Sequence, residues 1–344
     1  MRAVVILSIA CLCPVLAGAQ TFDISFEELA NMPPSARSVA LLRLRDSADA
    51  LATLREFELA ARQRSDARHE HGLPPRSEGC LNADEFDLDS QLKLARQASN
   101  GAQFSQSLVE YRQLAGGLDA KLAEARRTNL WRRQFPALRH WESEWRSARD
   151  PRTRELMLRT LNGQAIRAAL AKNKPPRLVQ GGTKNQRRLA PRVSVSRLAD
   201  TAYREYVFNL MCANDEENLD WFKRQVAEIG WFGQRKYGWA ADQAALLIVQ
   251  HADADPGFQE SVVAALWPRL TVNDTDPENF AYLVDRVAVH SGRPQSFGTQ
   301  MECVNGAWVV PEIQDHATLD NRRKRMNLVA YDVQLARTRG MCRD

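Results

Sequence analysis

The chain has 344 residues, of which 44% are hydrophobic and 26% are charged, and its formal net charge is +5. This length is enough for two domains or for one large domain. After residue 19 no segment is apolar enough to cross a bilayer, which excludes a membrane-spanning protein.

The positive charge is concentrated in the middle of the chain. Residues 126–197 contain 19 Lys and Arg against 4 Asp and Glu, a balance of +15, so the remainder of the chain has a balance of −10. Such a basic section is suited to docking on acidic surface elsewhere in the protein or to binding an anionic envelope component. Within it, residues 172–192 hold seven basic residues, three prolines and no acids, which predicts a flexible insertion.

The first 19 residues have the pattern of a cleavable export signal. A positive start at Arg2 precedes an apolar run, and Ala17-Gly18-Ala19 is a small-residue cleavage site before Gln20. The run is too short to span a membrane. The sequence therefore predicts a periplasmic or secreted protein, for which nucleic acid is not an expected partner.

The cysteines fit an oxidising compartment. Cleavage of the signal leaves an even number in the mature chain: Cys80, Cys212, Cys303 and Cys342. Four cysteines allow three pairings, and the absence of a CxxC spacing argues against zinc or thioredoxin-like chemistry. We expect one disulfide that pins the C-terminal tail, Cys303–Cys342, and a second that ties the two halves together, Cys80–Cys212.

The N-terminal half has helical periodicity throughout, which predicts a helical hairpin or bundle over residues 20–150. Glycine weakens a helix interior by about 1 kcal/mol, so Gly116-Gly117 is expected to interrupt the last helix. No dense polar motif occurs here, and we interpret this half as a scaffold or interaction module. The expected helices cover residues 26–32, 35–67, 87–98 and 102–127.

The C-terminal half, residues 151–344, predicts an α-helical domain with a small β-hairpin. Asn305-Gly306 is a favourable hairpin turn, and Val, Thr, Phe and Trp surround it. The fold class is therefore mainly α. The expected helices cover residues 196–211, 218–230, 239–251, 258–270, 279–290 and 318–328, the last continuing or restarting towards residue 337.

Polar motifs interrupt the apolar helical pattern between residues 250 and 300. Buried His, Asp, Arg and Gln are costly unless they are satisfied, so such residues form either an internal network or a site. Within a helix, neighbouring residues such as Asp285 and Arg286 point about 100° apart and can face different surroundings. The motifs are QHAD at 250–253, DPGFQ at 255–259, DR at 285–286 and QSFGTQ at 295–300.

The order of these motifs resembles an uncharacterised bacterial family, a domain of unknown function, over residues 154–331. Its QHAD, A-Y-L-x-D-R-V and G-x-P-Q-x-[YF]-G-T-Q motifs match residues 250–253, 281–287 and 292–300. An Asp-Gln-x-x-Arg element of the family stands here as Gly163-Gln164-Ala165-Ile166-Arg167, which leaves open whether Arg167 or Arg204 belongs to the site. The resemblance implies a domain and a set of site residues, and it implies no mechanism.

These residue types suit the binding or hydrolysis of an anionic substrate. His251 is the candidate acid or base, and Asp253 or Asp285 would orient it or activate water. Arginine would hold a phosphate or carboxylate, and the amides and Thr299 would bind other polar groups. No cofactor is predicted, and no metal, because only one histidine is well placed. The candidate substrate-binding residues are Arg204, Arg286, Gln250, Gln259, Gln295, Thr299 and Gln300.

The alternative is a non-enzymatic binding or interaction protein whose polar cluster is structural. The two interpretations predict different geometry. An enzyme should place four of these side chains around one pocket, whereas an interaction protein should bury them without a cavity and present an exposed basic or apolar surface elsewhere. The four are His251, Asp285, Arg286 and Gln300.

Overall fold

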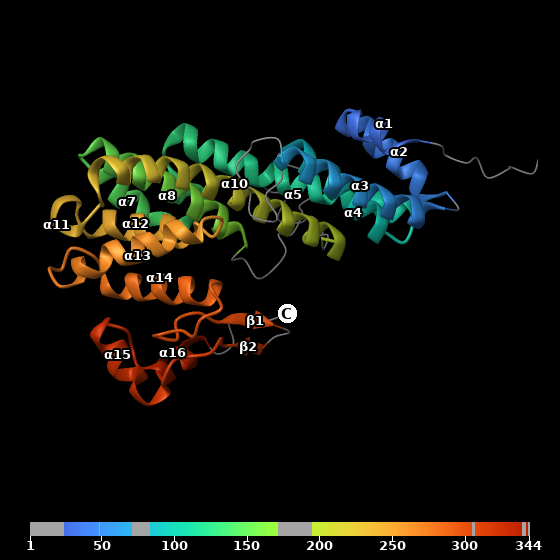
Figure 1. The fold of residues 1–344 in the computed structure, drawn as a ribbon. Coiled ribbons are helices and arrows are strands. Elements are labelled where there is room, and N and C mark those ends of the chain that lie inside the picture. The colour runs from blue at the N-terminus through green and yellow to red at the C-terminus, as the bar shows by residue number, and fades with distance from the viewer. Residues whose placement is uncertain are drawn as a thin grey trace, which may run out of the picture.

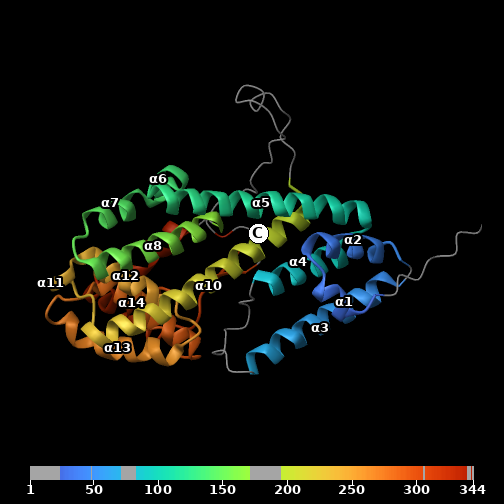
Figure 2. The same ribbon diagram turned by 90° about the horizontal axis from the view of Figure 1, so that it is seen from above.

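A computed structural model describes residues 24–47, 49–70, 83–170, 195–304, 307–338 and 342. Within these ranges the protein is mainly α-helical with one small antiparallel hairpin, as predicted. Figures 1 and 2 show the N-terminal helices at one end of the long helix α10 and helices α11–α14 at its other end. In Figure 1 the hairpin and the last two helices lie below α14.

Four helices form the N-terminal end. The prediction of a single helix over residues 35–67 is wrong, because one helix ends at Arg45 and another begins at Ala50. The carboxylate of Asp46 accepts the backbone N–H of Gly101 at 2.9 Å, and the Arg45 guanidinium donates to the Ala98 carbonyl at 2.8 Å. These contacts hold the turn between the two helices against the start of α5 (Gly101–Thr128). The helices are α1 (Phe26–Asn31), α2 (Pro34–Arg45), α3 (Ala50–Glu70) and α4 (Ala83–Gln97).

Helix α5 (Gly101–Thr128) runs without a break through Gly116 and Gly117, so the expected interruption is wrong. Ala115 and Leu118 on either side are buried, and packing of this face outweighs the weak helix propensity of the two glycines. The chain then reverses direction through short elements. These are α6 (Trp131–Gln134), the 3₁₀ turn η1 (Pro136–Leu138), α7 (Arg139–Ser147) and α8 (Pro151–Leu170).

Helix α10 (Arg197–Ile229) is one helix of 33 residues, where the sequence predicted two. Ser196 caps its first turn, and Gly230 ends it at φ 80°. The polar stretch between the two predicted helices stays helical because side chains of α8 form hydrogen bonds with its polar groups. Asn162 donates to Asn214 at 2.6 Å, and Arg167 donates to Asp215 at 2.6 Å. Helix α10 packs against α4, α5, α8 and α12 and so connects the two halves.

Three longer helices and one short helix follow at the C-terminal end of α10. Asp255 caps α13 and Asp276 caps α14 through their side-chain oxygens. The turn before α14 is held by the fully buried Asp242, which accepts from Trp231 Nε1 at 2.7 Å and from Thr275 Oγ1 at 3.0 Å. These helices are α11 (Gln234–Tyr237), α12 (Trp239–Gln250), α13 (Pro256–Leu270) and α14 (Pro277–His290).

The hairpin pairs β1 (Glu302–Val304) with β2 (Ala307–Val309), and Cys303 faces Trp308. The expected turn residues, Asn305 and Gly306, lie outside the described residues. Beyond the hairpin come η2 (His316–Thr318), α15 (Leu319–Arg325) and α16 (Tyr331–Thr338).

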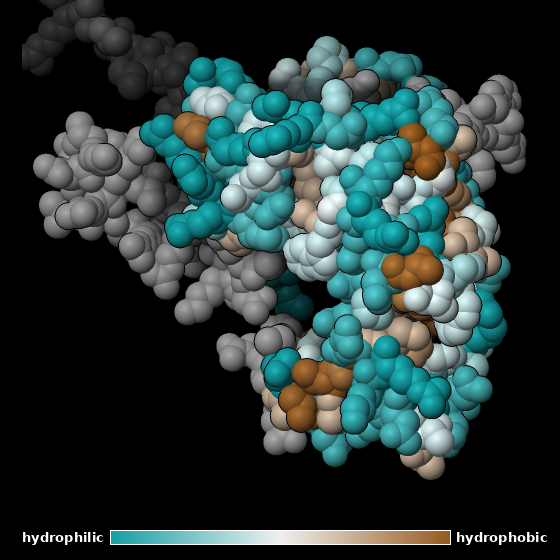
Figure 3. Space-filling model, turned by 90° about the vertical axis from the view of Figure 1, so that its left-hand side faces the viewer, coloured by the Kyte–Doolittle hydropathy of each residue, from teal (hydrophilic) through white to brown (hydrophobic). Residues whose placement is uncertain are grey.

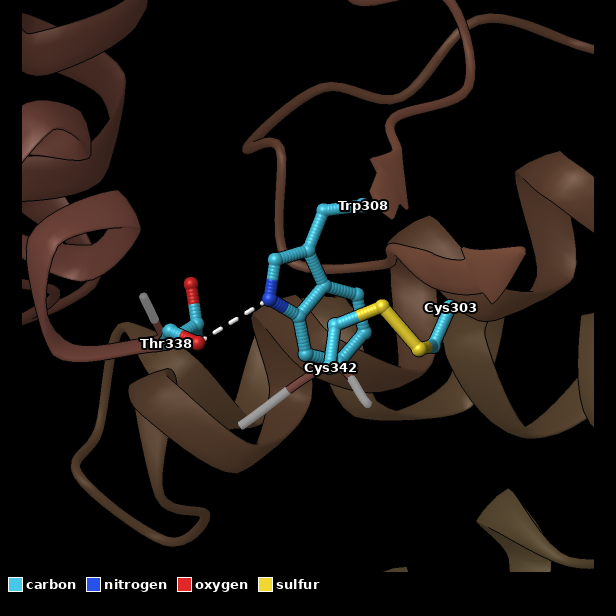
Figure 4. The surroundings of a disulfide bond; sticks show 4 residues. All are labelled: Cys303, Trp308, Thr338 and Cys342. Atoms are coloured by element: carbon cyan, nitrogen blue, oxygen red, sulfur yellow. Dashed lines mark hydrogen bonds between the residues drawn. A yellow bond between two sulfur atoms is a disulfide. The ribbon is translucent and has the colours of Figure 1, made fainter. Parts of the chain in front are cut away.

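A disulfide between Cys303 and Cys342 ties β1 to the C-terminal tail and confirms one predicted pairing (Figure 4). Beside it, Trp308 donates its indole N–H to the Thr338 carbonyl at 3.0 Å. Cys212 is also disulfide-bonded. Cys80 lies outside the described residues, so the Cys80–Cys212 pairing stays a prediction.

One hydrophobic core extends from Leu29 in α1 to Val287 in α14. A small second cluster of Ala281, Phe297 and Leu328 lies between α14 and the C-terminal segment. The predicted boundary at residue 150 separates elements that share the main core, and it stays a prediction. In the part of the chain described, none of the helices has the length and apolar character needed to cross a membrane.

Candidate functional site

The QHAD motif forms the end of α12 and the turn that follows it. His251 is the C-cap residue of α12, and its backbone N–H still bonds to Leu247 and Ile248. The imidazole is half-buried, whereas Asp253 is exposed two residues later. Gln250 is half-buried at the last helical position. The turn therefore presents a partly covered imidazole beside an accessible carboxylate.

Gln259, on the first turns of α13, holds this turn in shape. Its side chain is fully buried and donates to the Val249 carbonyl at 2.9 Å and to Asp253 at 3.3 Å. The amide thus connects the end of α12 to the carboxylate. In the described chain, the hydrogen bonds that the Gln259 side chain donates all go to residues 249–253, so its role is to stabilise this turn.

Asp253 pairs with two side chains of α14. Arg286 donates through both Nε, at 2.9 Å, and Nη2, which is a bidentate arrangement. His290 Nδ1 lies 3.4 Å from the same carboxylate. Burial alone would raise the pKa of Asp253, but the hydrogen bonds and charge of Arg286 outweigh it, and the pKa lies below its ordinary value. Asp253 is therefore ionised and firmly held.

These residues line a cavity of about 300 Å³. We call it the His251 pocket. Its walls come from α8, α10, the turn after α12, and α14. The lining residues are Arg167, Phe208, Met211, Cys212, Asp215, Glu216, Leu219, His251, Ala252, Asp253, Ala254 and Arg286.

The α10 wall of the pocket is a single helix stripe. Phe208, Met211, Asp215 and Leu219 are spaced by three or four residues, so they share one face. Phe208 is 58% exposed at the rim, whereas Leu219 is 5% exposed. Asp215 thus places a carboxylate between apolar side chains of this stripe, and the neighbouring Glu216 also lines the pocket.

Arg167 on α8 neutralises that carboxylate. Its Nη2 donates to Asp215 at 2.6 Å, and Nη1 donates to the Gly163 carbonyl at 3.3 Å. Burial raises the pKa of Asp215 above its ordinary value even though Arg167 opposes the shift. A Cβ on Gly163 would lie 2.9 Å from the Asn214 amide, so glycine permits this close approach of the two helices.

His251 shares its pocket with two positive charges, those of Arg167 and Arg286. Burial lowers its pKa first, and the charges of Arg167 and Arg286 lower it further, against the raising effect of Asp253, to about 3. The imidazole is therefore neutral at physiological pH. The helix C-terminus, which favours a cation, does not prevail over these effects.

Asp285, the third candidate catalytic residue, has different surroundings. Its carboxylate is fully buried and accepts the backbone N–H groups of Ser296 at 2.8 Å, Phe297 at 3.0 Å and Thr299 at 2.8 Å. The Thr299 hydroxyl donates at 2.9 Å. Burial raises the pKa of Asp285 despite these donors. The carboxylate anchors the segment between α14 and the hairpin.

Gln295 and Gln300 complete this second network. Gln295 is fully buried, donates to the Gln300 and Pro311 carbonyls at 3.1 Å each, and accepts the Gln300 N–H at 2.7 Å. Gln300 donates to the Tyr282 carbonyl at 3.3 Å. Arg323, also fully buried, donates to the carbonyl of Phe297 at 2.5 Å. These bonds hold an irregular segment that has few backbone partners of its own.

The sequence-predicted residues therefore divide into two groups. His251, Asp253 and Arg286 line the pocket, and Gln250 and Gln259 support the same turn. Asp285, Gln295, Thr299 and Gln300 form the neighbouring network, and none of these four is among the pocket-lining residues. Arg204 pairs with Asp200 at 3.0 Å on the exposed side of α10, whereas Arg167 lines the pocket. In the described residues no three His, Cys, Asp or Glu side chains are grouped to hold a metal.

This geometry falls within a segment with known relatives. Residues 197–337 match the family of unknown function DUF6624. No curated protein and no solved structure matches the chain. The DUF6624 segment contains α10 to α16, and therefore most of the His251 pocket. Arg167, on α8, is supplied from outside the matched residues.

The sequence predictions missed Asp215. It belongs to the acidic run Asn214-Asp215-Glu216-Glu217, which resembles a solvated surface. The available signal was its spacing, because Asp215 continues the apolar stripe of Met211 and Leu219 on one helix face. One predicted helix ended at residue 211 and the next began at residue 218, so Asp215 was not assigned to a helix face.

Replacing Asp285 should destabilise the fold. In Asp285→Ala, two buried N–H groups, one partly buried N–H group and one hydroxyl lose their acceptor, and we expect a loss of about 3–5 kcal/mol in the free energy of unfolding, measured in urea. The matched change Asp253→Ala, at a partly exposed pair, should cost about 1 kcal/mol or less. Equal stability of Asp285→Ala and the unsubstituted protein would contradict the anchoring role.

The pH dependence of stability should report on His251. Its folded pKa of about 3 lies below the unfolded value of about 6.5, so only the unfolded chain gains a proton between these values. The contribution of His251 to the free energy of unfolding is fully present above pH 6.5 and declines as the pH falls towards 3. Between pH 7 and 5, the unsubstituted protein should lose more stability than His251→Gln. An NMR titration in which the His251 ring protonates near pH 6.5 would refute this.

Proposed function

We propose that the C-terminal half binds a small molecule with an acidic group in the His251 pocket. The observation that carries this proposal is that one pocket is lined by His251 and by two arginines from different helices, Arg167 and Arg286. Their combined effect on the pKa of His251 exceeds that of Asp253, so positive potential prevails at the ring. An anionic group is favoured at such a position.

Donors for that group are available. Arg286 uses Nε and Nη2 for Asp253, and within the described residues its Nη1 makes no hydrogen bond. Nε of Arg167 is buried without a hydrogen-bond partner in the same part of the chain. A neutral imidazole adds one N–H donor. Together they supply charge-assisted hydrogen bonds of the kind that recognise a carboxylate or phosphate.

Binding is better supported than catalysis. A group with a pKa of about 3 is a weak base at neutral pH, and Asp253 is held as a low-pKa carboxylate by Arg286. Hydrolysis of an anionic substrate is the second candidate. It is favoured by one feature, the opposite pKa shifts of Asp215 and Asp253, since acid–base pairs in active sites show such a divergence.

An interaction role is a separate proposal for the basic section. Arg133, Arg139 and Arg149 are exposed, and within the described residues they form no ion pairs, so they suit an anionic envelope component. On the end of the molecule seen in Figure 3, apolar side chains occur as isolated groups on a mostly hydrophilic surface. This favours a charged partner over an apolar one at that end.

We also propose that the protein is exported to the periplasm or beyond. The signal pattern of residues 1–19 and the Cys303–Cys342 disulfide support this location. Sequencing of the N-terminus of protein recovered from the periplasm or the medium should begin at Gln20. Recovery of the intact N-terminus from the cytoplasm alone would refute export.

A thermal-shift screen of small carboxylates and phosphates tests the binding function. A ligand at 100 times its Kd should stabilise the protein by about 2.7 kcal/mol. Arg286→Ala and Arg167→Ala should each weaken binding by about tenfold or more, because each removes a charge-assisted donor.

The matched control is Arg204→Ala, which removes an ion-paired arginine of α10 outside the pocket. It should bind ligand like the unsubstituted protein. A ligand whose affinity survives both pocket substitutions binds elsewhere, and absence of any ligand in the screen would count against the proposal.

A further inference from the structure

The His251 pocket contains charges of both signs, as two separate ion pairs and the carboxylate of Glu216. One pair, Arg167–Asp215, joins α8 to α10, and the other, Arg286–Asp253, joins α14 to the turn after α12. Both carboxylates line the pocket, and the charge of Asp253 adds to the burial that raises the pKa of Asp215. A ligand in this space meets positive and negative groups at once.

The two pairs differ in their remaining hydrogen-bonding capacity. Asp253 already accepts from Arg286 and Gln259 and lies beside His290. Asp215 accepts only from Arg167 and, at 3.4 Å, from Asn214 in the described chain. An ionised carboxylate has about four acceptor positions, so Asp215 retains room for a further donor.

The positive counterpart of that open acceptor is Arg286. Its Nη1 is the guanidinium nitrogen that the described residues leave without a bond, and His251 lines the same pocket. A ligand carboxylate fits here, and a ligand ammonium fits at Asp215. A purely anionic ligand would satisfy Arg286 but would face the Asp215 carboxylate.

Apart from Glu216, the rest of the wall is uncharged and mostly apolar, and the space is small. Phe208, Met211 and Leu219 share the face of α10 that carries Asp215, and Ala252 on the turn after α12 also lines the pocket. A volume of about 300 Å³ is at the lower end of the range for small-molecule sites, which suits a ligand of amino-acid size.

From this juxtaposition we infer that the ligand is an α-amino acid with an apolar side chain. Its ammonium binds Asp215, its carboxylate binds Arg286 and His251, and its side chain packs on Phe208, Met211 and Leu219. This inference rests on the proposed function and specifies the ligand class for the same pocket.

Isothermal titration calorimetry with three compounds tests it. Leucine carries both charges, N-acetyl-leucine lacks the ammonium, and leucinamide lacks the carboxylate. Since a charge-assisted hydrogen bond contributes about a tenfold change in affinity, leucine should bind the unsubstituted protein at least about tenfold more tightly than either derivative. This comparison needs no substitution and so cannot fail through misfolding.

The outcomes separate the inference from the function on which it rests. If N-acetyl-leucine binds as tightly as leucine, the amino-acid inference is overturned and acid binding stands. If leucinamide binds as tightly as leucine, both are overturned. If none of the three binds, the inference is overturned, and acid binding then depends on the wider screen.

A substitution identifies the ammonium partner. Asp215→Asn should remove the preference for leucine over N-acetyl-leucine, because leucine loses its ammonium partner and N-acetyl-leucine no longer faces a carboxylate. Asp200→Asn, an ion-paired carboxylate of α10 outside the pocket, is the control and should keep the preference. A preference that persists in Asp215→Asn, with the fold verified by circular dichroism, would overturn the assignment to Asp215.

Discussion

The ion pair between Arg167 and Asp215 is the contact on which the rest of the structure depends. Both side chains lie in the interface of α8 and α10, where an unpaired charge would be costly to bury. The pair, together with the neighbouring Asn162–Asn214 amide contact, keeps α10 helical through a polar stretch that would otherwise favour solvent. One continuous helix can then reach both the N-terminal helices and α12. The pocket lies where this pair meets the end of α12.

Local patterns were sufficient to predict most helices, the hairpin and the Cys303–Cys342 disulfide, because periodicity and cysteine spacing are properties of the sequence itself. The failures occurred where a distant segment decides the local structure. Gly116 and Gly117 stay helical because the neighbouring residues Ala115 and Leu118 are buried in the core. Asn214 and Asp215 stay helical because side chains of α8 form hydrogen bonds with them. At Asp46 the reverse holds, since its contact with Gly101 ends a helix that periodicity would extend.

The sequence was enough to predict the region of the candidate site, but not how its side chains are arranged. Asp285 and Arg286 are adjacent, and the rotation of about 100° per residue sends them to different surroundings. Asp285 enters the network that anchors residues 296–299, whereas Arg286 reaches Asp253. Motifs that are close in sequence thus serve two purposes. Arg167 and Asp215 could not be assigned from the motifs because they come from elements that meet only in the folded chain.

The Cys303–Cys342 bond has a practical consequence for anyone producing this protein. It closes a loop of 39 residues that contains β2, α15 and α16, the elements that buttress the Asp285 network through Arg323. In a reducing host cytosol the bond would not form, and β2 would be joined to the end of α16 by the weaker hydrogen bond from Trp308 to the Thr338 carbonyl. Recombinant material is therefore best directed to an oxidising compartment, and purification tags are better placed away from Cys342.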